Sequence, residues 1–240
     1  MGTAVSFDVR DPVPSEAIGE AVAALHAADR VFSPYRPDSA VSAIQRGEVR
    51  PDECPPEVIE VAALCQRLED ETRGWFRATI AGTFDPSGAV KAWALDRAAA
   101  VLRRAGARRF CINGGGDIVV GTRPEPGRLW GVGVSDPLAR GRMAAVLRLE
   151  GTAVATSGTA ERGGHIRHPV TGAPATQLAS VTVTGPDLVT ADAWATAAVA
   201  MGWAAPERLA GLEGYEALVI GWNAQRWEST GFRHLSSSGI

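Results

Sequence analysis

Residues 108–122 read RRFCINGGGDIVVGT, two short apolar runs on either side of three consecutive glycines. Both runs have the length and composition of strands, and no helix pattern follows the glycines, which excludes a GxGxxG phosphate-binding turn. Glycines tolerate positive φ and let the backbone approach another backbone or a ligand closely. Two interpretations follow: a tight turn capped by Asp117, or a loop that shapes a ligand site.

More strand patterns follow in the second half of the chain. They cover 130–135, 144–150, 152–157, 178–185 and 216–222, and the Pro-rich stretch 122–128 is typical of a hairpin connection. So many strands with few helices between them indicate an antiparallel or mixed sheet.

Helical patterns flank these strands. Helices are predicted over 15–30, 55–72, 89–106 and 189–202, with a first strand over 3–9 and a short helix capped near 38–39. Ser15 and Thr190 are candidate N-caps, and Gly106 and Gly202 are the expected helix ends. The pattern predicts an α+β fold, a mixed or antiparallel sheet flanked by helices, as a single domain over residues 1–240.

Composition narrows the classes of function. The chain has 240 residues and a formal net charge of −3 without a basic stripe, so nucleic acid is not an expected partner. Its three cysteines lack metal-ligand spacing, which argues against a zinc ribbon or a disulfide framework. Neither a membrane-spanning stretch nor a secretion signal is visible, so we expect a cytoplasmic protein without a membrane anchor.

Lys91 is the single lysine among 24 basic residues. Lysine is a compact point charge where arginine is a wide planar fork, so this lysine indicates either a specific role or chance survival at the surface. It lies about one turn into the helix that follows FDPSG (84–88), with Asp85, Gly88 and Asp96 around the same junction. The N–H groups at a helix N-terminus bind anions such as phosphate.

Asp192 and Thr196 lie four residues apart in the helix predicted over 189–202. They therefore project from the same face. A carboxylate and a hydroxyl, completed by carbonyl and phosphate oxygens, suit a hard cation. Acidic residues near a helix N-terminus are also common without any metal, because they favour the helix dipole.

Two of the four histidines, His165 and His168, lie in GGHIRHPVTG (163–172). A zinc pair would need further Cys or His ligands at suitable spacing, and the sequence offers none nearby. A loop histidine beside a phosphate site can act as a general base, and a structural histidine is the alternative.

Six blocks, in this order, resemble the ApbE-like flavin transferases, the family of FAD:protein FMN transferases. They are MGTAVSF (1–7), VFSPYRPDSAVSAI (31–44), FDPSGAVKAWALDRAA (84–99), CINGGGDIVVGT (111–122), ATSGTAERGGHIRHPVTGAPA (155–175) and SVTVTGPDLVTADAWATAAVAMG (180–202). The resemblance implies a two-lobed, T-fold-like α+β architecture that binds FAD, with Mg²⁺ on the pyrophosphate. It also implies transfer of FMN from FAD to a Ser or Thr hydroxyl of a target flavoprotein, which forms a phosphoester and releases AMP.

The resemblance also implies roles for individual residues. FAD contacts fall on Met1, Tyr35, Asp85, Lys91, Asn113, Gly114, Gly115, Asp117, His165 and Ile166, and the metal site on Gly88, Asp192, Ala195 and Thr196. His165 is the candidate base, and Lys91 is the second candidate catalytic residue. This favours a base at His165 over a zinc pair, because phosphoryl transfer needs a metal, a cation, amide donors and a base for the attacking hydroxyl.

Two positions depart from the family pattern. His168 stands where the family usually has Asp, and Ala92 stands where it usually has Gly. Two other functions therefore stay open beside transfer to a protein: a flavin carrier that binds FAD without transfer, and a Mg²⁺-dependent FAD pyrophosphatase that gives FMN and AMP.

Overall fold

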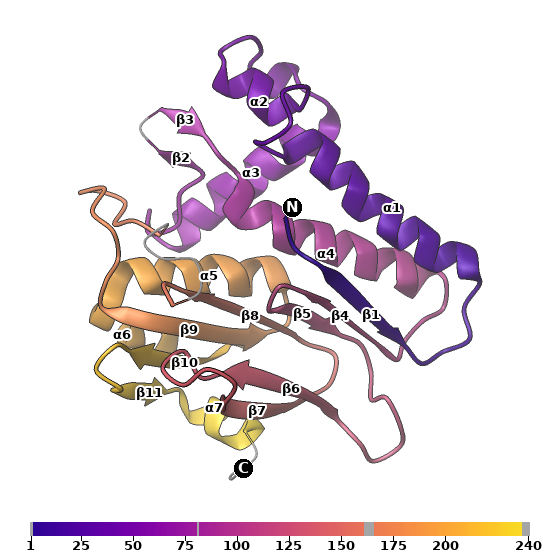
Figure 1. Ribbon diagram of the computed structural model, residues 1–240, viewed down its shortest axis with the longest axis vertical. Coiled ribbons are helices and arrows are strands. Elements are labelled where there is room, and N and C mark those ends of the chain that lie inside the picture. Colours follow the sequence, from indigo (N-terminus) through magenta and orange to yellow (C-terminus); the bar gives the residue numbers. More distant parts are fainter. Residues whose placement is uncertain (1, 81, 161–165, 237–240) are drawn as a thin grey trace.

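The computed structural model describes residues 2–80, 82–160 and 166–236. A seven-stranded sheet runs through its centre in the order β1-β4-β5-β8-β9-β10-β11 (Figure 1). These strands are β1 (Val5–Val9), β4 (Phe110–Gly114), β5 (Asp117–Val120), β8 (Ala153–Gly158), β9 (Leu178–Gly185), β10 (Glu216–Gly221) and β11 (Arg226–Glu228). Every neighbouring pair is antiparallel, so the predicted sheet is confirmed in its antiparallel form.

Helices cover one face of this sheet. The helices α4 (Ser87–Arg104) and α5 (Leu188–Met201) contact its strands, and α1 (Ser15–Phe32), α2 (Ala40–Gln45) and α3 (Pro56–Glu71) lie further out. The α5 helix packs on β8, β9 and α4, and every one of its residues except Thr196 is buried. A helix that is apolar almost all round belongs in a core, and α5 joins the sheet to the outer helices.

A two-stranded ribbon and a short helix cover the opposite face (Figure 1). The ribbon is β6 (Trp130–Ser135) and β7 (Met143–Leu149), and the helix is α7 (Thr230–Leu235). A second apolar cluster, which includes Ile118, Val132, Leu218 and Phe232, joins them to the sheet. The fold is therefore α+β, with helices on one face and a ribbon on the other.

The predicted hairpin connection at 122–128 needs a correction. It does contain a tight turn, in which the Arg128 amide donates to the Glu125 carbonyl at 3.1 Å. However, β5 pairs with β4 and β8, and β6 pairs with β7. The stretch therefore leads from the central sheet to the separate ribbon, because β6 and β5 belong to different sheets.

Both predicted serine and threonine N-caps at the long helices are wrong. Pro14 occupies the cap position of α1, and Ser15 is its first helical residue. At α5 the cap is Asp187, whose Oδ1 accepts from the Thr190 amide at 2.7 Å. The predicted ends are confirmed: Gly202 follows α5 with φ 65°, and Gly106 follows α4 with φ 92°.

Several short elements had no sequence prediction. They are β2 (Thr79–Ile80), β3 (Thr83–Phe84), α6 (Ala205–Ala210), β11, α7 and two 3₁₀ turns, η1 (Pro51–Glu53) and η2 (Gly202–Ala204). Elements this short carry too few residues for a periodic pattern. In the described part of the chain, none of the helices combines the length and the apolar composition that crossing a membrane requires.

Candidate functional site

The glycine-rich turn joins β4 to β5 as a two-residue hairpin. Gly115 and Gly116 have φ of 64° and 94°, a combination that a tight hairpin turn requires and that side chains resist. Asn113 caps the turn, because its Oδ1 accepts from the Gly116 amide at 3.1 Å; of the two interpretations from the sequence, the tight turn is present but its cap is not Asp117. A Cβ atom at Gly115 would lie 2.6 Å from Oγ1 of Thr3, so the turn also packs against the start of the chain.

Asp117 is instead the partner of Lys91. Its side chain is fully buried, and its Oδ2 lies 2.7 Å from the Lys91 Nζ, whose side chain is 20% exposed. A buried carboxylate needs a paired charge, and a single ammonium reaches it where a planar guanidinium would need more room. Lys91 is therefore an ion-paired, mostly buried lysine that ties α4 to the glycine turn.

The start of α4 presents Asp85 and Gly88 at the surface. The Asp85 Oδ1 accepts from the Ser87 amide at 3.0 Å, which orders the turn that leads into the helix. A Cβ at Gly88 would lie 3.3 Å from the Phe76 ring, so its backbone lies directly beside that ring. Ala92 is fully buried, so its methyl group fills core space and does not crowd this surface.

Asp96 does not belong to this junction, contrary to the sequence interpretation. It lies further along α4 and lines two cavities of about 330 and 290 Å³, together with Asp187. Burial, with a smaller contribution from the charge of Asp187, raises the pKa of Asp96 to about 7. Lys91, Asp117, Asp192 and Thr196 line neither cavity, so these cavities are separate from the predicted flavin site.

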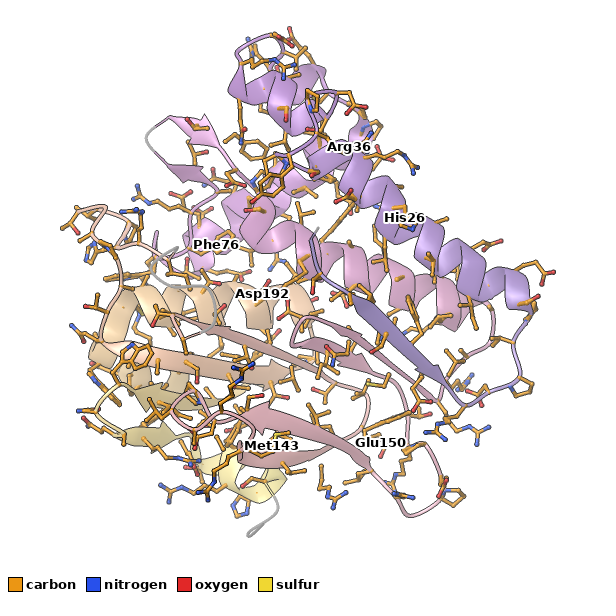
Figure 2. All side chains as sticks on the ribbon, viewed as in Figure 1. His26, Arg36, Phe76, Met143, Glu150 and Asp192 are labelled. Atoms are coloured by element: carbon orange, nitrogen blue, oxygen red, sulfur yellow. The ribbon has the colours of Figure 1, made fainter. Side chains whose placement is uncertain are left out.

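Asp192 and Thr196 lie on α5 as the sequence predicted. Figure 2 shows Asp192 near the centre of the molecule, where α4 and α5 come together. The side chain of Asp192 is 5% exposed, whereas Thr196 is partly open. The Thr196 Oγ1 lies 2.9 Å from Oγ of Ser157 on β8, a residue to which the sequence interpretation gave no role.

Asp192 and Thr196 offer one carboxylate and one hydroxyl on the same helix. Among the described residues, no group of three or more His, Cys, Asp or Glu side chains is arranged to hold a metal. A hard cation held by Asp192 and Thr196 would therefore need most of its oxygen ligands from backbone carbonyls, phosphate and water. Mg²⁺ binds in this way, because it keeps several waters and prefers few carboxylates plus substrate phosphates.

The remaining predicted residues fall into three groups. Met1 and His165 lie outside the described residues. Tyr35, between α1 and α2, is 94% exposed and so presents its ring to solvent. Ile166 and Ala195 are buried, so contact with a ligand or metal would come through their backbone.

His168 supplies the acceptor that the usual Asp would supply. Its Nδ1 accepts from the Val170 and Thr171 amides at 3.2 and 3.3 Å, as a carboxylate does in an Asx turn. Its ring meets Trp75 edge to face, with centroids 5.0 Å apart. The His168 ring therefore preserves the turn through its Nδ1.

Together these features define a class: an antiparallel α+β protein with a glycine hairpin tied to α4 by the Lys91–Asp117 ion pair, and with a buried carboxylate and a partly open hydroxyl on α5. The chain matches the ApbE family model over residues 1–85 and 81–219. It therefore belongs to the ApbE family, and the resemblance found in its sequence blocks is confirmed.

Relatives and solved structures agree with this assignment. The chain is 29% identical over 185 residues to the FAD:protein FMN transferase of Klebsiella pneumoniae (strain 342), covering 70% of this chain and 52% of the relative. It is 33% identical over 187 residues to that of Rhodobacter capsulatus, covering 69% of this chain and 35% of the relative. The chain thus spans about half, or less, of the length of these relatives.

Two solved structures share the fold at low sequence identity. Flavin transferase ApbE from Vibrio cholerae superposes with a TM-score of 0.80 at 22% identity, covering 98% of this chain and 96% of that chain. The ApbE protein from Thermotoga maritima gives a TM-score of 0.84 at 22% identity, covering 99% and 97%. The predicted fold class is confirmed over nearly the whole chain.

Proposed function

We propose that this protein is a Mg²⁺-dependent FAD:protein FMN transferase. In this reaction the acceptor is a Ser or Thr hydroxyl of a flavoprotein, the product is a phosphoester-linked FMN, and AMP leaves. Membership of the family and the curated names of the relatives support the activity. The observation that carries the proposal for this chain is the partial exposure of Thr196 on α5. It lies one turn beyond the buried carboxylate of Asp192.

The chemistry asks for charge neutralisation more than for covalent catalysis. FAD carries two negatively charged phosphates, and a Mg²⁺ ion held by Asp192, Thr196 and the Gly88 backbone would neutralise developing charge on them. Lys91 adds a fixed positive charge, because its ion pair with Asp117 orients the ammonium on a side chain that is 20% exposed. An ammonium has three donors, so the bond to Asp117 leaves others for a phosphate oxygen.

The transfer step needs a base at the attacking hydroxyl. The acceptor oxygen forms a bond to the FMN phosphorus, the bond from that phosphorus to the AMP oxygen breaks, and the hydroxyl proton moves to a base. We assign the base to His165, which lies in the family block 155–175 but outside the described residues. We assign FAD contacts to Met1, Tyr35, Asp85, Ile166 and the glycine turn, again from the family pattern.

The decisive experiment follows the mass of an acceptor. A flavodomain with a Ser or Thr acceptor is incubated with this protein, FAD and Mg²⁺, and its intact mass and the released AMP are measured in the same tubes. A gain of one phosphoester-linked FMN, with AMP and only with Mg²⁺, supports the transferase. AMP without an adduct would point to the pyrophosphatase, and bound FAD without either product would point to the flavin carrier.

The partners and the compartment follow from the same proposal. FAD and an acceptor flavoprotein are the partners, and the cytoplasmic location stays a prediction from the sequence. Fractionation of the native host with an antibody to this protein would test that location.

A further inference from the structure

Ser157 lies where it can control the hydroxyl of Thr196. It is on β8, two residues after the fully buried Ala155, so it points to the same face of the sheet, the face that α5 covers. Its Oγ and the Thr196 Oγ1 are 2.9 Å apart, a full hydrogen bond in a partly buried place. The strand and the helix are thus joined at the one residue of α5 that is not buried.

The backbone fixes Ser157 in this position. The next residue, Gly158, lies so close to β9 that a Cβ there would collide with the carbonyl oxygen of Ala179. Ser157 itself pairs with Val181 in the β8–β9 ladder. The serine therefore stands on a rigid element and not on a loop.

A hydroxyl has one proton and two lone pairs. When Thr196 binds a cation, a lone pair must point at the ion, so its proton must point elsewhere. The Ser157 Oγ lies 2.9 Å away, either hydroxyl of the pair could donate, and Ser157 can therefore accept this proton. We propose that Ser157 is a positioning residue: it accepts the Thr196 proton and so directs a lone pair of Thr196 at a hard divalent cation. This rests on the proposed function, and nothing in the family pattern assigned a role to Ser157.

The chain contains a matched control for this pair. On the opposite face of the same strand, Thr156 Oγ1 and Thr182 Oγ1 also lie 2.9 Å apart. That second hydroxyl pair has the same length and the neighbouring position in β8, but it points away from α5. Removing it tests the loss of a hydroxyl–hydroxyl bond in β8 without touching Thr196.

The experiment is a MgCl₂ titration of the whole protein with FAD present, after removal of metal with EDTA. The readouts are the thermal midpoint and the quenching of FAD fluorescence, so no turnover is needed. We expect Ser157→Ala to raise the Mg²⁺ concentration at half effect by about 10-fold, because loss of a partner that orients a metal ligand costs about 10–100-fold in affinity. Ser157→Thr keeps the hydroxyl and should stay close to wild type, and Thr156→Val should lower the midpoint without moving the Mg²⁺ dependence.

Each outcome of this titration supports or overturns the role of Ser157. Wild-type Mg²⁺ dependence in Ser157→Ala, or an equal shift in Thr156→Val, would overturn the role of Ser157 and leave the transferase proposal in place. If wild-type protein shows no Mg²⁺ effect on either readout, the metal site of the proposed function fails, and the role of Ser157 fails with it. Should Ser157→Ala not fold, Ser157→Cys fills the same space with a weaker acceptor and should show the same shift.

Discussion

Replacement of Asp96 by asparagine should stabilise the protein, and more so at alkaline pH. Asp96 lies on α4 and lines both cavities beside Asp187, with Arg103 also lining one of them. Burial raises its pKa from 3.8 to about 7, the nearby charge of Asp187 adds to this, and Arg103 opposes it. The other charged groups at the cavities are Glu60, Arg67 and Arg97.

The sign of the effect follows from proton uptake. Between the two pKa values the folded state holds a proton that the unfolded state has lost, so stability falls as the pH rises from about 4 to about 7. A pKa shift of about three units corresponds to about 4 kcal/mol at pH 8 and to about 1.5 kcal/mol at pH 5, as an upper bound. Asparagine keeps the shape without the charge, so Asp96→Asn should gain about 2.5 kcal/mol more at pH 8 than at pH 5.

The assay is urea unfolding of both proteins at the two pH values. Groups common to both proteins cancel in the difference, and Asp70→Asn on α3, an exposed position, controls for the loss of one negative charge. If Asp96→Asn raises the free energy of unfolding equally at both pH values, or lowers it at pH 8, the reasoning is refuted. The burial of an ionised Asp96 would then not be what destabilises the protein. It would then follow that water or a cation reaches the carboxylate through the cavities.

Four further predictions concern the candidate site. Lys91→Met should destabilise the fold by up to about 3–5 kcal/mol, because it removes the ammonium 2.7 Å from the buried Asp117 carboxylate, and adding Asp117→Asn should recover most of this in chemical unfolding. Asp192→Ala should abolish Mg²⁺-stimulated turnover while FAD binding stays measurable by fluorescence; full activity would exclude its metal role. Gly115→Ala should lower the thermal midpoint more than Gly127→Ala, since both have positive φ but only Gly115 meets Thr3. His165→Ala should lower the transfer rate far more than FAD affinity, and an equal loss of both would make it a binding residue.

The sequence predicted the structural features that depend on residues close together in the chain. The strands of the second half, the turn of three glycines, and the helix ends at Gly106 and Gly202 all follow from local patterns, and the structure confirms them. The predicted N-cap of α5 was wrong for a local reason as well. Asp187 and Thr190 are both suitable cap residues, and only the path of the backbone decides between them.

What the sequence missed depends on contacts between distant segments. The ion pair of Asp117 could not be seen, because its partner Lys91 lies on α4 and not in the hairpin that contains Asp117. Ser157 is one of several hydroxyl residues in the block 155–175, and only the packing of α5 on β8 singles it out. Asp96 was placed at the junction by nearness in sequence, yet it lies beyond Lys91 along α4 and lines cavities beside Asp187.

The position of the proposed metal site on α5 has a physical reason. Ions in a dry core are costly, and a hydroxyl or carboxylate there needs partners. In α5 the polar groups are concentrated in one place: Asp192 is buried, Thr196 opens one turn later, and Ser157 meets Thr196 from the sheet. The rest of the helix is packed tightly enough to hold these oxygens still, which a site for a metal and a pyrophosphate needs. Because Asp187 caps α5 and also lines both cavities with Asp96, a charge change at the cavities acts on the helix that carries the proposed metal ligands. If α5 moves as one rigid element, Asp96→Asn should raise the stability of the protein and leave its Mg²⁺ titration unchanged. A shifted titration would show that a charge change near the start of α5 alters the positions of Asp192 and Thr196.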